Sequence, residues 1–350
     1  MTVMVLRVAI NGFGRIGRML FRLWFSQCFG CEAEGVTKVE IVAINDVADW
    51  HTLAYLLEFD STHGRFPHAV FFDEEKKVLN VGGKSIPVFQ ESDPVHLPWA
   101  ELNVDVVVES SRKYRTKQAL SVHRARGAKR VLLACPGDSP LDCLSVYGIN
   151  HLSIAQHQYI SAASCTVNAL AVALKPLQQF SVQSLSFTEI HAVTADQKTV
   201  DCAHSDIRRS RASSVNMIPT STRATSLIAE VFPEYQGVVQ GYSLRVPVLN
   251  VACLDMTVIC QRPVSLKEVH LAYRFFAETS LKGVLFYNEQ PLVSSDFIGH
   301  CASAVYDATQ TSVVANALKI VVWYDNEWGY ANRLWDLLKH LQTVNHASND

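Results

Sequence analysis

The sequence predicts a two-domain α/β protein, in which a parallel sheet covered by helices precedes a domain with a mostly antiparallel sheet. Two observations support this prediction. Over the first 160 residues, short apolar runs alternate with segments of helical periodicity, the order of parallel strands joined by crossover helices. Beyond that point, longer runs alternate apolar with polar residues, which is typical of strands buried on one face. We expect the change of fold near residue 160, without a flexible linker.

The first domain begins with a strand–helix–strand unit. Residues 5–11 form an apolar run that ends in glycines, residues 15–27 carry apolar side chains at helical spacing, and residues 39–44 form a second apolar run. Such βαβ units build parallel sheets with right-handed crossovers. Further buried strands are expected at 104–109 and 130–134, with helices at 52–57 and 116–126.

The second domain is expected to open with a strand over 159–164 and an apolar helix over 167–180, broken at Pro176. Long alternating runs predict strands of a sheet that helices cover on one face. These runs are 184–194, 246–260 and 318–324, and the amphipathic helices are 265–281 and 328–344. Residues 195–219 are polar and Arg-rich, and we expect a long loop there, which in a compact domain is usually functional or at an interface.

Composition excludes several classes of protein. The chain has 350 residues, of which 49% are hydrophobic and 18% charged, as expected of packed globular domains. A net charge of -2 gives no electrostatic reason to expect binding to nucleic acid or to an anionic membrane. No run reaches the roughly 18 apolar residues that span a bilayer, and the N-terminal run lacks the basic start of a signal peptide. We therefore expect a cytoplasmic protein without nucleic-acid or membrane partners.

The nine cysteines are odd in number and scattered along the chain. Several lie in apolar runs, so we expect free thiols rather than a disulfide framework. Cys28 and Cys31 form a lone Cys-x-x-Cys, but no second pair of cysteines or histidines follows at zinc spacing. We therefore expect no metal site.

A glycine-rich turn follows the first predicted strand. Gly12-Phe13-Gly14-Arg15-Ile16-Gly17 matches G-x-G-x-x-G between a buried strand and a helix, the context in which such a turn binds a dinucleotide. Gly12 allows the tight turn, Gly14 lets the backbone approach a pyrophosphate, and Gly17 permits close packing of helix on strand. The helix N-terminus then faces the anion. Asp46 ends the second strand, where it is placed to accept hydrogen bonds from an adenosine ribose, which favours NAD over NADP.

Cys165 stands where a predicted strand gives way to a predicted helix. A thiol at a helix N-terminus has its thiolate stabilised by the helix dipole and free N–H groups, so we expect a lowered pKa. His191, in an alternating strand of the same domain, is expected to reach the thiol, to act as base for its attack and then as acid. A structural role is the commoner one for a buried cysteine, and we expect it for the other eight.

Several motifs together resemble one known family, that of the glyceraldehyde-3-phosphate dehydrogenases. They run in family order from residue 7 to about residue 340 and cover nearly the whole chain. The matching segments are Ile10-Asn-Gly-Phe-Gly-Arg-Ile-Gly-Arg18, Ala43-Ile-Asn-Asp46, Phe59-Asp-Ser-Thr-His-Gly64, Ala163-Ser-Cys-Thr166, Gln197-Lys-Thr-Val-Asp201, Arg245-Val-Pro247 and Trp323-Tyr-Asp-Asn-Glu-Trp-Gly-Tyr330.

The resemblance implies a Rossmann-type NAD-binding domain over residues 1–164, an α+β catalytic domain over 165–328, and a C-terminal helix over 329–350 that packs back on the first domain. It implies oxidation of a small phosphorylated aldehyde. Hydride passes from a Cys165 hemithioacetal to NAD, and phosphate or water then takes the acyl group from the thioester. It also implies a homotetramer, in which residues 195–219 reach a neighbouring cofactor site.

The resemblance also assigns site residues by position. Asn326 resembles the residue that holds the nicotinamide amide, and Thr194 and Arg245 resemble the substrate-phosphate site. The residues expected around the attacking phosphate are Ser164, Thr166, Thr222 and the adjacent Arg223. The residues expected at the cofactor are Gly12, Phe13, Gly14, Arg15, Ile16, Gly17, Asp46, Ser111, Asn326 and Tyr330.

Five positions depart from the family pattern, namely Arg112, Ala134, Val167, Asp196 and Arg223. Arg112 stands where the family has a glycine beside the dinucleotide, and Asp196 replaces a threonine at the substrate phosphate. An acid at the position of Asp196 and a cation at that of Arg223 resemble the erythrose-4-phosphate dehydrogenase branch. The acyl enzyme of that branch is released mainly by water.

Two hypotheses follow. The first is a working NAD-dependent dehydrogenase that slightly favours erythrose 4-phosphate over glyceraldehyde 3-phosphate, because segments such as Leu97-Pro-Trp99 and Asp206-Ile-Arg-Arg209 resemble the erythrose branch. Thr194 instead resembles the glycolytic enzymes, and residues 113–118 resemble the arsenate-linked ones. The second hypothesis is a catalytically weakened relative that acts as a binding or regulatory protein, which Arg112, Ala134 and Val167 around the cofactor would favour.

Overall fold

The computed structural model describes residues 5–29 and 39–347, so Cys31 lies outside the described residues. The chain divides into two compact units, and each is described by itself. Unit 1 contains Met1–Ser145, Asn150–Ala163 and Ala331–Asp350, and unit 2 contains Val146–Ile149 and Ser164–Tyr330. Within the described ranges, no helix is long and apolar enough to cross a membrane.

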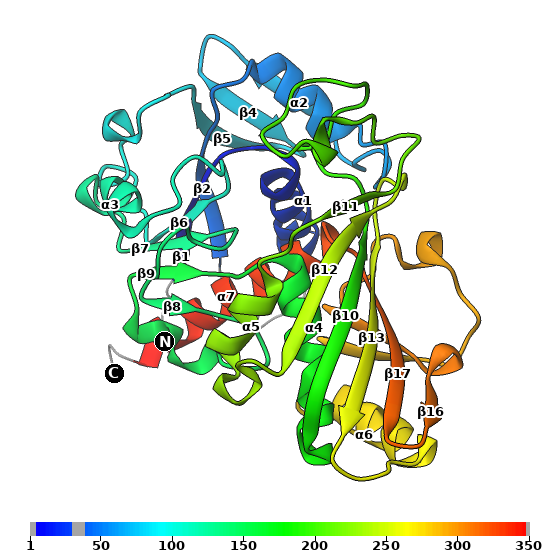
Figure 1. Ribbon diagram of the computed structural model, residues 1–350. Helices are drawn as coiled ribbons and strands as arrows, with labels where there is room; N and C mark the ends of the chain where they lie inside the picture. Colours follow the sequence, from blue (N-terminus) through cyan, green and yellow to red (C-terminus); the bar gives the residue numbers. More distant parts are fainter. Residues whose placement is uncertain (1–4, 30–38, 348–350) are drawn as a thin grey trace. The chain divides into compact units, whose positions relative to one another are not determined.

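Unit 1 is built around one sheet of nine strands (Figure 1). The strands are β1 (Leu6–Asn11), β2 (Val39–Asn45), β3 (Val70–Asp73), β4 (Val78–Val81), β5 (Lys84–Phe89), β6 (Val106–Glu109), β7 (Arg130–Leu133), β8 (Cys143–Leu144) and β9 (Tyr159–Ser161). Their order is β3-β4-β5-β2-β1-β6-β7-β9-β8. All pairs from β5 to β8 are parallel, whereas β4 pairs antiparallel with β3 and β5.

The helices of unit 1 are α1 (Arg15–Phe29), α2 (Trp50–Glu58), α3 (Lys117–Ala125) and, from Ala331 on, α7 (Trp328–Ala347). The centre of the sheet is apolar on both faces, as a helix-covered parallel sheet requires: Val8, Ala9 and Ile10 of β1 are fully buried. Capping side chains fix where the helices begin. Asp49 accepts a hydrogen bond from the backbone N–H of Thr52 at the start of α2, and Thr116 caps α3 in the same way.

Unit 2 contains a sheet of eight strands and three helices. The strands are β10 (Val182–His191), β11 (Ile218–Thr220), β12 (Val239–Arg245), β13 (Ala252–Cys260), β14 (Leu285–Asn288), β15 (Ala304–Asp307), β16 (Ser312–Val314) and β17 (Ala317–Tyr324). The helices are α4 (Cys165–Leu174), α5 (Ala224–Val231) and α6 (Leu266–Glu278). The sheet order is β11-β12-β10-β13-β17-β15-β14, with β16 paired to β17, and most pairs are antiparallel.

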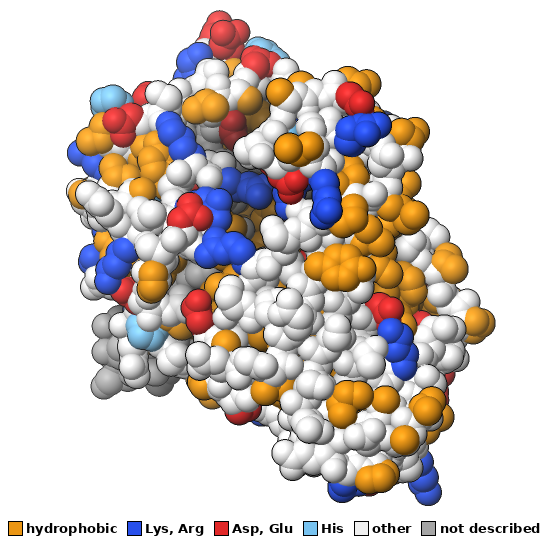
Figure 2. Space-filling view, in the orientation of Figure 1, with side chains coloured by type: hydrophobic (Ala, Val, Ile, Leu, Met, Phe, Trp, Pro, Cys, Tyr) orange, Lys and Arg blue, Asp and Glu red, His pale blue; other side chains and the backbone are white. Residues whose placement is uncertain are grey.

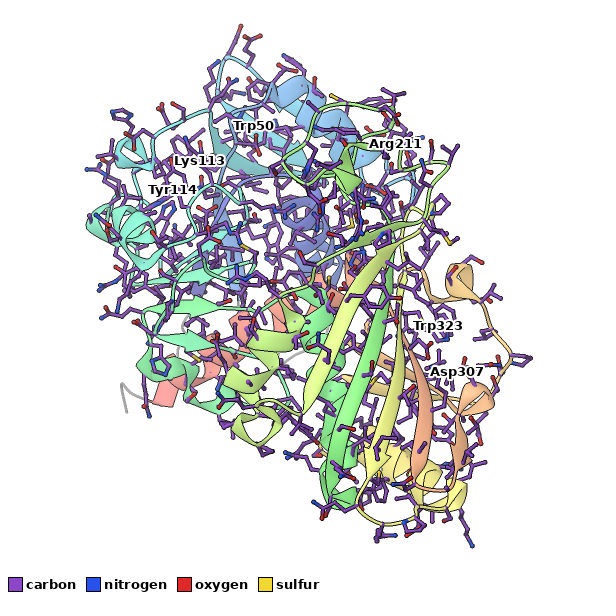
Figure 3. The ribbon with its side chains drawn as sticks, in the orientation of Figure 1. Trp50, Lys113, Tyr114, Arg211, Asp307 and Trp323 are labelled. Carbon is purple, nitrogen blue, oxygen red and sulfur yellow. The ribbon has the colours of Figure 1, made fainter. Side chains whose placement is uncertain are left out.

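Period-two alternation along β10 sets which side chains reach the interior of unit 2. Leu185, Phe187, Glu189 and His191 are buried, because successive side chains of a strand point to opposite faces. Helix α4 is buried from Thr166 to Leu174 and packs against β15 and β17. The sheet is tied together at β17 and β15, where the indole Nε1 of Trp323 donates a 3.0 Å hydrogen bond to Asp307 (Figure 3).

The fold class is confirmed: a parallel-dominant sheet forms unit 1 and a mostly antiparallel sheet forms unit 2. Each predicted helix overlaps a helix of the structure. The strand predicted over 246–260 is wrong in its first half, since β13 begins only at Ala252. Strand β12 was missed because Gln240, Gly241 and Ser243 hide its alternation. Helix α5 and the short strands β3, β4, β5, β8, β11, β14, β15 and β16 were also missed.

Candidate active site

The end of the first strand and the glycine-rich turn form one tightly packed loop in unit 1. Gly12 has a φ of +97°, and a Cβ there would lie 2.4 Å from the backbone nitrogen of Ser111. A Cβ on Gly17 would lie 2.4 Å from the carbonyl oxygen of Gly12. Gly14 differs, because a Cβ there meets no atom within 4 Å. The backbone at Gly14 is therefore open at the start of α1, as the approach of a pyrophosphate requires.

Asp46 at the end of β2 fixes this loop. Its carboxylate accepts hydrogen bonds from the backbone N–H of Phe13 at 2.6 Å and of Ala48 at 2.9 Å. Arg15 is held by an ion pair with the buried Asp60. Burial by itself would raise the pKa of Asp60, but Arg15 and backbone N–H groups outweigh it and lower that pKa to about 2. Asp46 and Arg15 therefore have structural partners in addition to the cofactor role expected of them.

A buried polar network lies beneath the loop, and the sequence analysis missed it. Glu109 is fully buried at the end of β6, and one carboxylate oxygen accepts from the backbone N–H and the hydroxyl of Ser111. The other accepts from Asn11 and, at 3.0 Å, from Nε2 of His123. The indole N–H of Trp99 donates to Nδ1 of His123, which leaves the ring proton on Nε2. The signal was available, because an acid that ends an apolar strand needs buried donors.

Arg112 follows Ser111 and adopts a left-handed backbone conformation, with a φ of +64°. Its side chain is exposed. The next two residues anchor the loop, since Lys113 Nζ and Tyr114 Oη each donate to the carbonyl of Ser92 at 3.1 Å (Figure 3). The loop therefore keeps the backbone shape of a glycine-containing turn although an arginine occupies it.

Cys165 is the first residue of α4 and is half-buried. The hydroxyl of Ser164 caps the helix by accepting from the backbone N–H of Val167 at 3.2 Å. His191 ends β10 and is 3% exposed. Its Nε2 lies 3.6 Å from Sγ of Cys165. The structure thus brings together the two residues that the sequence predicts to be catalytic.

The tautomer of His191 follows from its second nitrogen. Nδ1 lies 2.7 Å from the carbonyl oxygen of Ala192, and because a carbonyl only accepts, Nδ1 carries the proton. Nε2 then presents its lone pair to the thiol of Cys165. This arrangement lets the imidazole take the thiol proton directly.

The predicted lowering of the pKa of Cys165 is wrong. Burial raises the pKa of this thiol to about 11, and the nearby Glu189 adds to the rise. Burial also lowers the pKa of His191 to about 4, with a contribution from Arg245. The helix N-terminus does not offset the loss of water around the thiolate. These two shifts favour a neutral thiol and a neutral imidazole near pH 7.

A second buried group at this site was also missed. The hydroxyl of Thr166 donates to Oε1 of Glu189 and lies 3.1 Å from the hydroxyl of Tyr324. All three side chains are less than 5% exposed. Glu189 is two residues before His191, so β-strand alternation places both on the same face. An acidic residue at that buried position was the available signal.

Arg245 ends β12 at the position that pairs with His191 across the sheet. Among the described residues, its Nε and Nη1 are buried and have no hydrogen-bond partner. A buried guanidinium with free donors is suited to a phosphate or carboxylate. Arg245 is therefore the residue of unit 2 best placed to bind an anionic group near Cys165.

Asp196 does not present an uncompensated charge. It forms an ion pair with Arg209, and Nε2 of His204 lies 3.4 Å away. Burial by itself would raise the pKa of Asp196, but the hydrogen bonds from Arg209 and His204 outweigh it and lower that pKa. The ion pair of Arg209 with Asp196 cross-links the 195–219 segment, and Arg209 also donates to Thr220 at 2.7 Å.

The remaining predicted residues of unit 2 lie at element ends. The backbone N–H of Thr194 donates to Gln197, the hydroxyl of Thr222 accepts from the N–H of Ala224 at the start of α5, and Arg223 is exposed. In the described part of the chain, none of the three is hydrogen-bonded to Cys165 or His191. Asn326 and Tyr330 are both less than 10% exposed, and Oδ1 of Asn326 has no hydrogen-bond partner among the described residues.

Comparison with known proteins covers both units. Residues 6–117 match the family model "Glyceraldehyde 3-phosphate dehydrogenase, NAD binding domain", and residues 164–326 match the C-terminal domain of the same family. A plasmid-encoded glyceraldehyde-3-phosphate dehydrogenase of Cupriavidus necator is 42% identical over 95% of this chain and 97% of its own length. That of Mycobacterium leprae is 43% identical over 96% and 98%. Glyceraldehyde-3-phosphate dehydrogenase 2 of Bacillus subtilis is 40% identical over 97% of each chain.

These matches confirm the predicted family and the predicted cofactor, because the NAD-binding model covers the glycine-rich turn, Asp46 and Ser111. They extend over nearly the whole chain and nearly the whole of each relative. The chain belongs to the glyceraldehyde-3-phosphate dehydrogenase family and is an NAD-dependent dehydrogenase.

Proposed function

We propose that this protein oxidises a small phosphorylated sugar aldehyde through a covalent intermediate on Cys165. The observation that carries the proposal is the 3.6 Å approach of Nε2 of His191 to Sγ of Cys165, with Nδ1 of the same ring held by a carbonyl. A nucleophile and a base oriented by a third group are the parts that nucleophilic catalysis requires.

The first step is attack of sulfur on the aldehyde carbon. The C–S bond forms as the thiol proton passes to Nε2 of His191, and the aldehyde oxygen takes that proton to give a thiohemiacetal. Because both groups are neutral before the step, the site does not hold a separated ion pair in the absence of substrate. Arg245 binds the substrate phosphate, and its unpartnered Nε and Nη1 support this role.

Oxidation then leaves a thioester on Cys165. Bound NAD would supply the hydride acceptor, and His191 takes the hydroxyl proton of the thiohemiacetal as the carbonyl forms. Gly12 to Gly17 and Ser111 would hold the dinucleotide in unit 1, since the backbone at Gly14 is open at the start of α1. The free Oδ1 of Asn326 supports a hydrogen bond to the nicotinamide amide. An acyl acceptor then releases the product and restores the thiol.

The names of the relatives make glyceraldehyde 3-phosphate the first substrate to test. The preference for erythrose 4-phosphate stays a prediction. The ion pair of Asp196 with Arg209 does not bear on it, because both aldehydes carry a phosphate. NADH formation from each aldehyde, with and without phosphate or arsenate, tests the proposal. NADH from either aldehyde supports it. Tight NAD binding without any NADH would favour the weakened, regulatory relative instead.

We also propose that the chain forms a homotetramer. Figure 2 shows hydrophobic side chains gathered over the sheet of unit 2. Tyr242 of β12 is 49% exposed and Leu249 is 64% exposed. Large exposed apolar patches usually mark an interface between proteins. Native mass spectrometry tests the proposal: a mass of four chains is expected, and a monomer at micromolar concentration would contradict it. The cytoplasmic location stays a prediction.

A further inference from the structure

A buried carboxylate lies beside the catalytic pair. Glu189 is 2% exposed, and its Oε1 is 3.8 Å from Nε2 of His191. Among the described residues, His191 is the only basic side chain recorded within 4 Å of this carboxylate. The lowered pKa of His191 leaves the ring neutral near pH 7. While His191 is neutral, no cationic side chain among the described residues lies within 4 Å of the Glu189 carboxylate.

The hydroxyl of Thr166 uses its only proton in a hydrogen bond to the Glu189 carboxylate. Its single proton goes to Oε1 of Glu189, since an ionised carboxylate only accepts, and its oxygen can then accept from the hydroxyl of Tyr324. Thr166 is adjacent to the nucleophile, with Oγ1 3.9 Å from Sγ of Cys165. This hydroxyl consequently has no proton left to donate to an anion at Cys165.

Charge decides what can attack an acyl group on Cys165. An anionic nucleophile must bring its charge into a poorly hydrated space that already contains the carboxylate of Glu189, which repels it. The electrostatic coupling is direct, since Glu189 also disfavours the negative charge of the Cys165 thiolate. Arg245 is electrostatically coupled to Cys165, but the phosphate of the bound substrate would neutralise it. Water carries no charge and meets no such penalty.

We propose that Glu189 is a specificity-determining residue that selects water over inorganic phosphate as the acyl acceptor. The proposal rests on the thioester of the proposed function. His191 first releases the proton of the oxidation step to solvent. The water oxygen then bonds to the acyl carbon while its proton passes to Nε2 of His191. The C–S bond then breaks, and its electron pair returns to sulfur, which regains the proton from His191. The product leaves as a carboxylic acid, which ionises in solvent, and no further oxidant or reductant is required.

The test compares wild type with Glu189→Gln, which removes the charge but keeps an oxygen that can accept from Thr166. The matched control is Glu278→Gln, an exposed residue at the end of α6. With NAD and glyceraldehyde 3-phosphate saturating, ³¹P NMR measures the ratio of acyl phosphate to free acid as inorganic phosphate is raised. Wild type and Glu278→Gln should form mainly the acid at a rate independent of phosphate. Glu189→Gln should raise the ratio by about tenfold or more.

A second measurement needs no variant. The acyl enzyme of the wild type, formed in one turnover, should lose its acyl group faster with neutral hydroxylamine but at an unchanged rate with phosphate. Acceleration by phosphate would overturn the proposal even if Glu189→Gln did not fold, and so would equal product ratios in wild type and Glu189→Gln. Absence of any NADH in the first turnover would instead overturn the proposed function, and this inference with it.

Discussion

At the scale of single residues, the proposed chemistry depends on the protonation state of Cys165. Because burial raises its pKa to about 11, little thiolate exists near pH 7. We expect the rate of its alkylation by iodoacetamide to rise about tenfold per pH unit from about pH 7 to pH 10. Peptide mass spectrometry measures this rate, with the exposed Cys202 and Cys301 as internal references. A plateau beginning near pH 6 would indicate a thiolate–imidazolium pair and contradict the raised pKa.

The protonation of His191 also affects the free energy of unfolding of the protein. Its folded pKa of about 4 lies below the value of 6.5 for an ordinary histidine, so the unfolded chain binds a proton that the folded chain does not between those limits. The free energy of unfolding should therefore fall as the pH is lowered through this window, by up to about 3 kcal/mol from this group. Urea unfolding at about pH 7 and pH 4.5 should show a smaller loss for His191→Asn. Equal losses would contradict the neutral, buried imidazole.

At the scale of elements, the loop after β6 contains a strained residue. Arg112 has a φ of +64°, which costs about 1 kcal/mol for a residue with a Cβ. Arg112→Gly should raise the free energy of unfolding by about that amount. Arg112→Ala removes the same cation but keeps the Cβ, so it should give no comparable gain. Urea unfolding of both variants separates strain from charge, and an equal effect of the two would exclude strain as the cause.

Two glycines of the turn between β1 and α1, Gly12 and Gly14, allow a second comparison of matched variants. Gly12→Ala places a Cβ 2.4 Å from the backbone of Ser111, so the two loops must separate. We expect a loss of about 2 kcal/mol or more in unfolding free energy and weaker NAD binding. Gly14→Ala meets no protein atom and should leave stability within about 0.5 kcal/mol. Thermal unfolding and NAD titration test this, and equal stability of the two variants would contradict the packing described.

For the whole molecule, patterns in the sequence predicted most of the fold. Apolar periodicity found every helix except α5 and the long strands except β12, because burial of one face imposes it. Strand β12 escaped because its outward face is polar and a glycine interrupts it. Its pairing with β10 is a long-range property that no local pattern contains.

The site was predictable only in part. Motifs identified Cys165 and His191, which the structure places 3.6 Å apart. The direction of the thiol pKa was missed, because desolvation depends on how the surrounding elements pack rather than on position at a helix end. The buried acids Glu109 and Glu189 were missed although an acid in an apolar strand was an available signal. Their partners come from other elements, so their role emerges only when the sheet is assembled.

The most direct test of the account is a single-turnover measurement on the intact protein. Saturating NAD and either aldehyde are mixed with enzyme, and NADH and protein mass are recorded before deacylation. We expect one NADH for each Cys165, an increase in protein mass equal to the acyl group, and neither signal in Cys165→Ala. NADH formed by Cys165→Ala at the wild-type rate, or an acyl group on another residue, would contradict catalysis through Cys165.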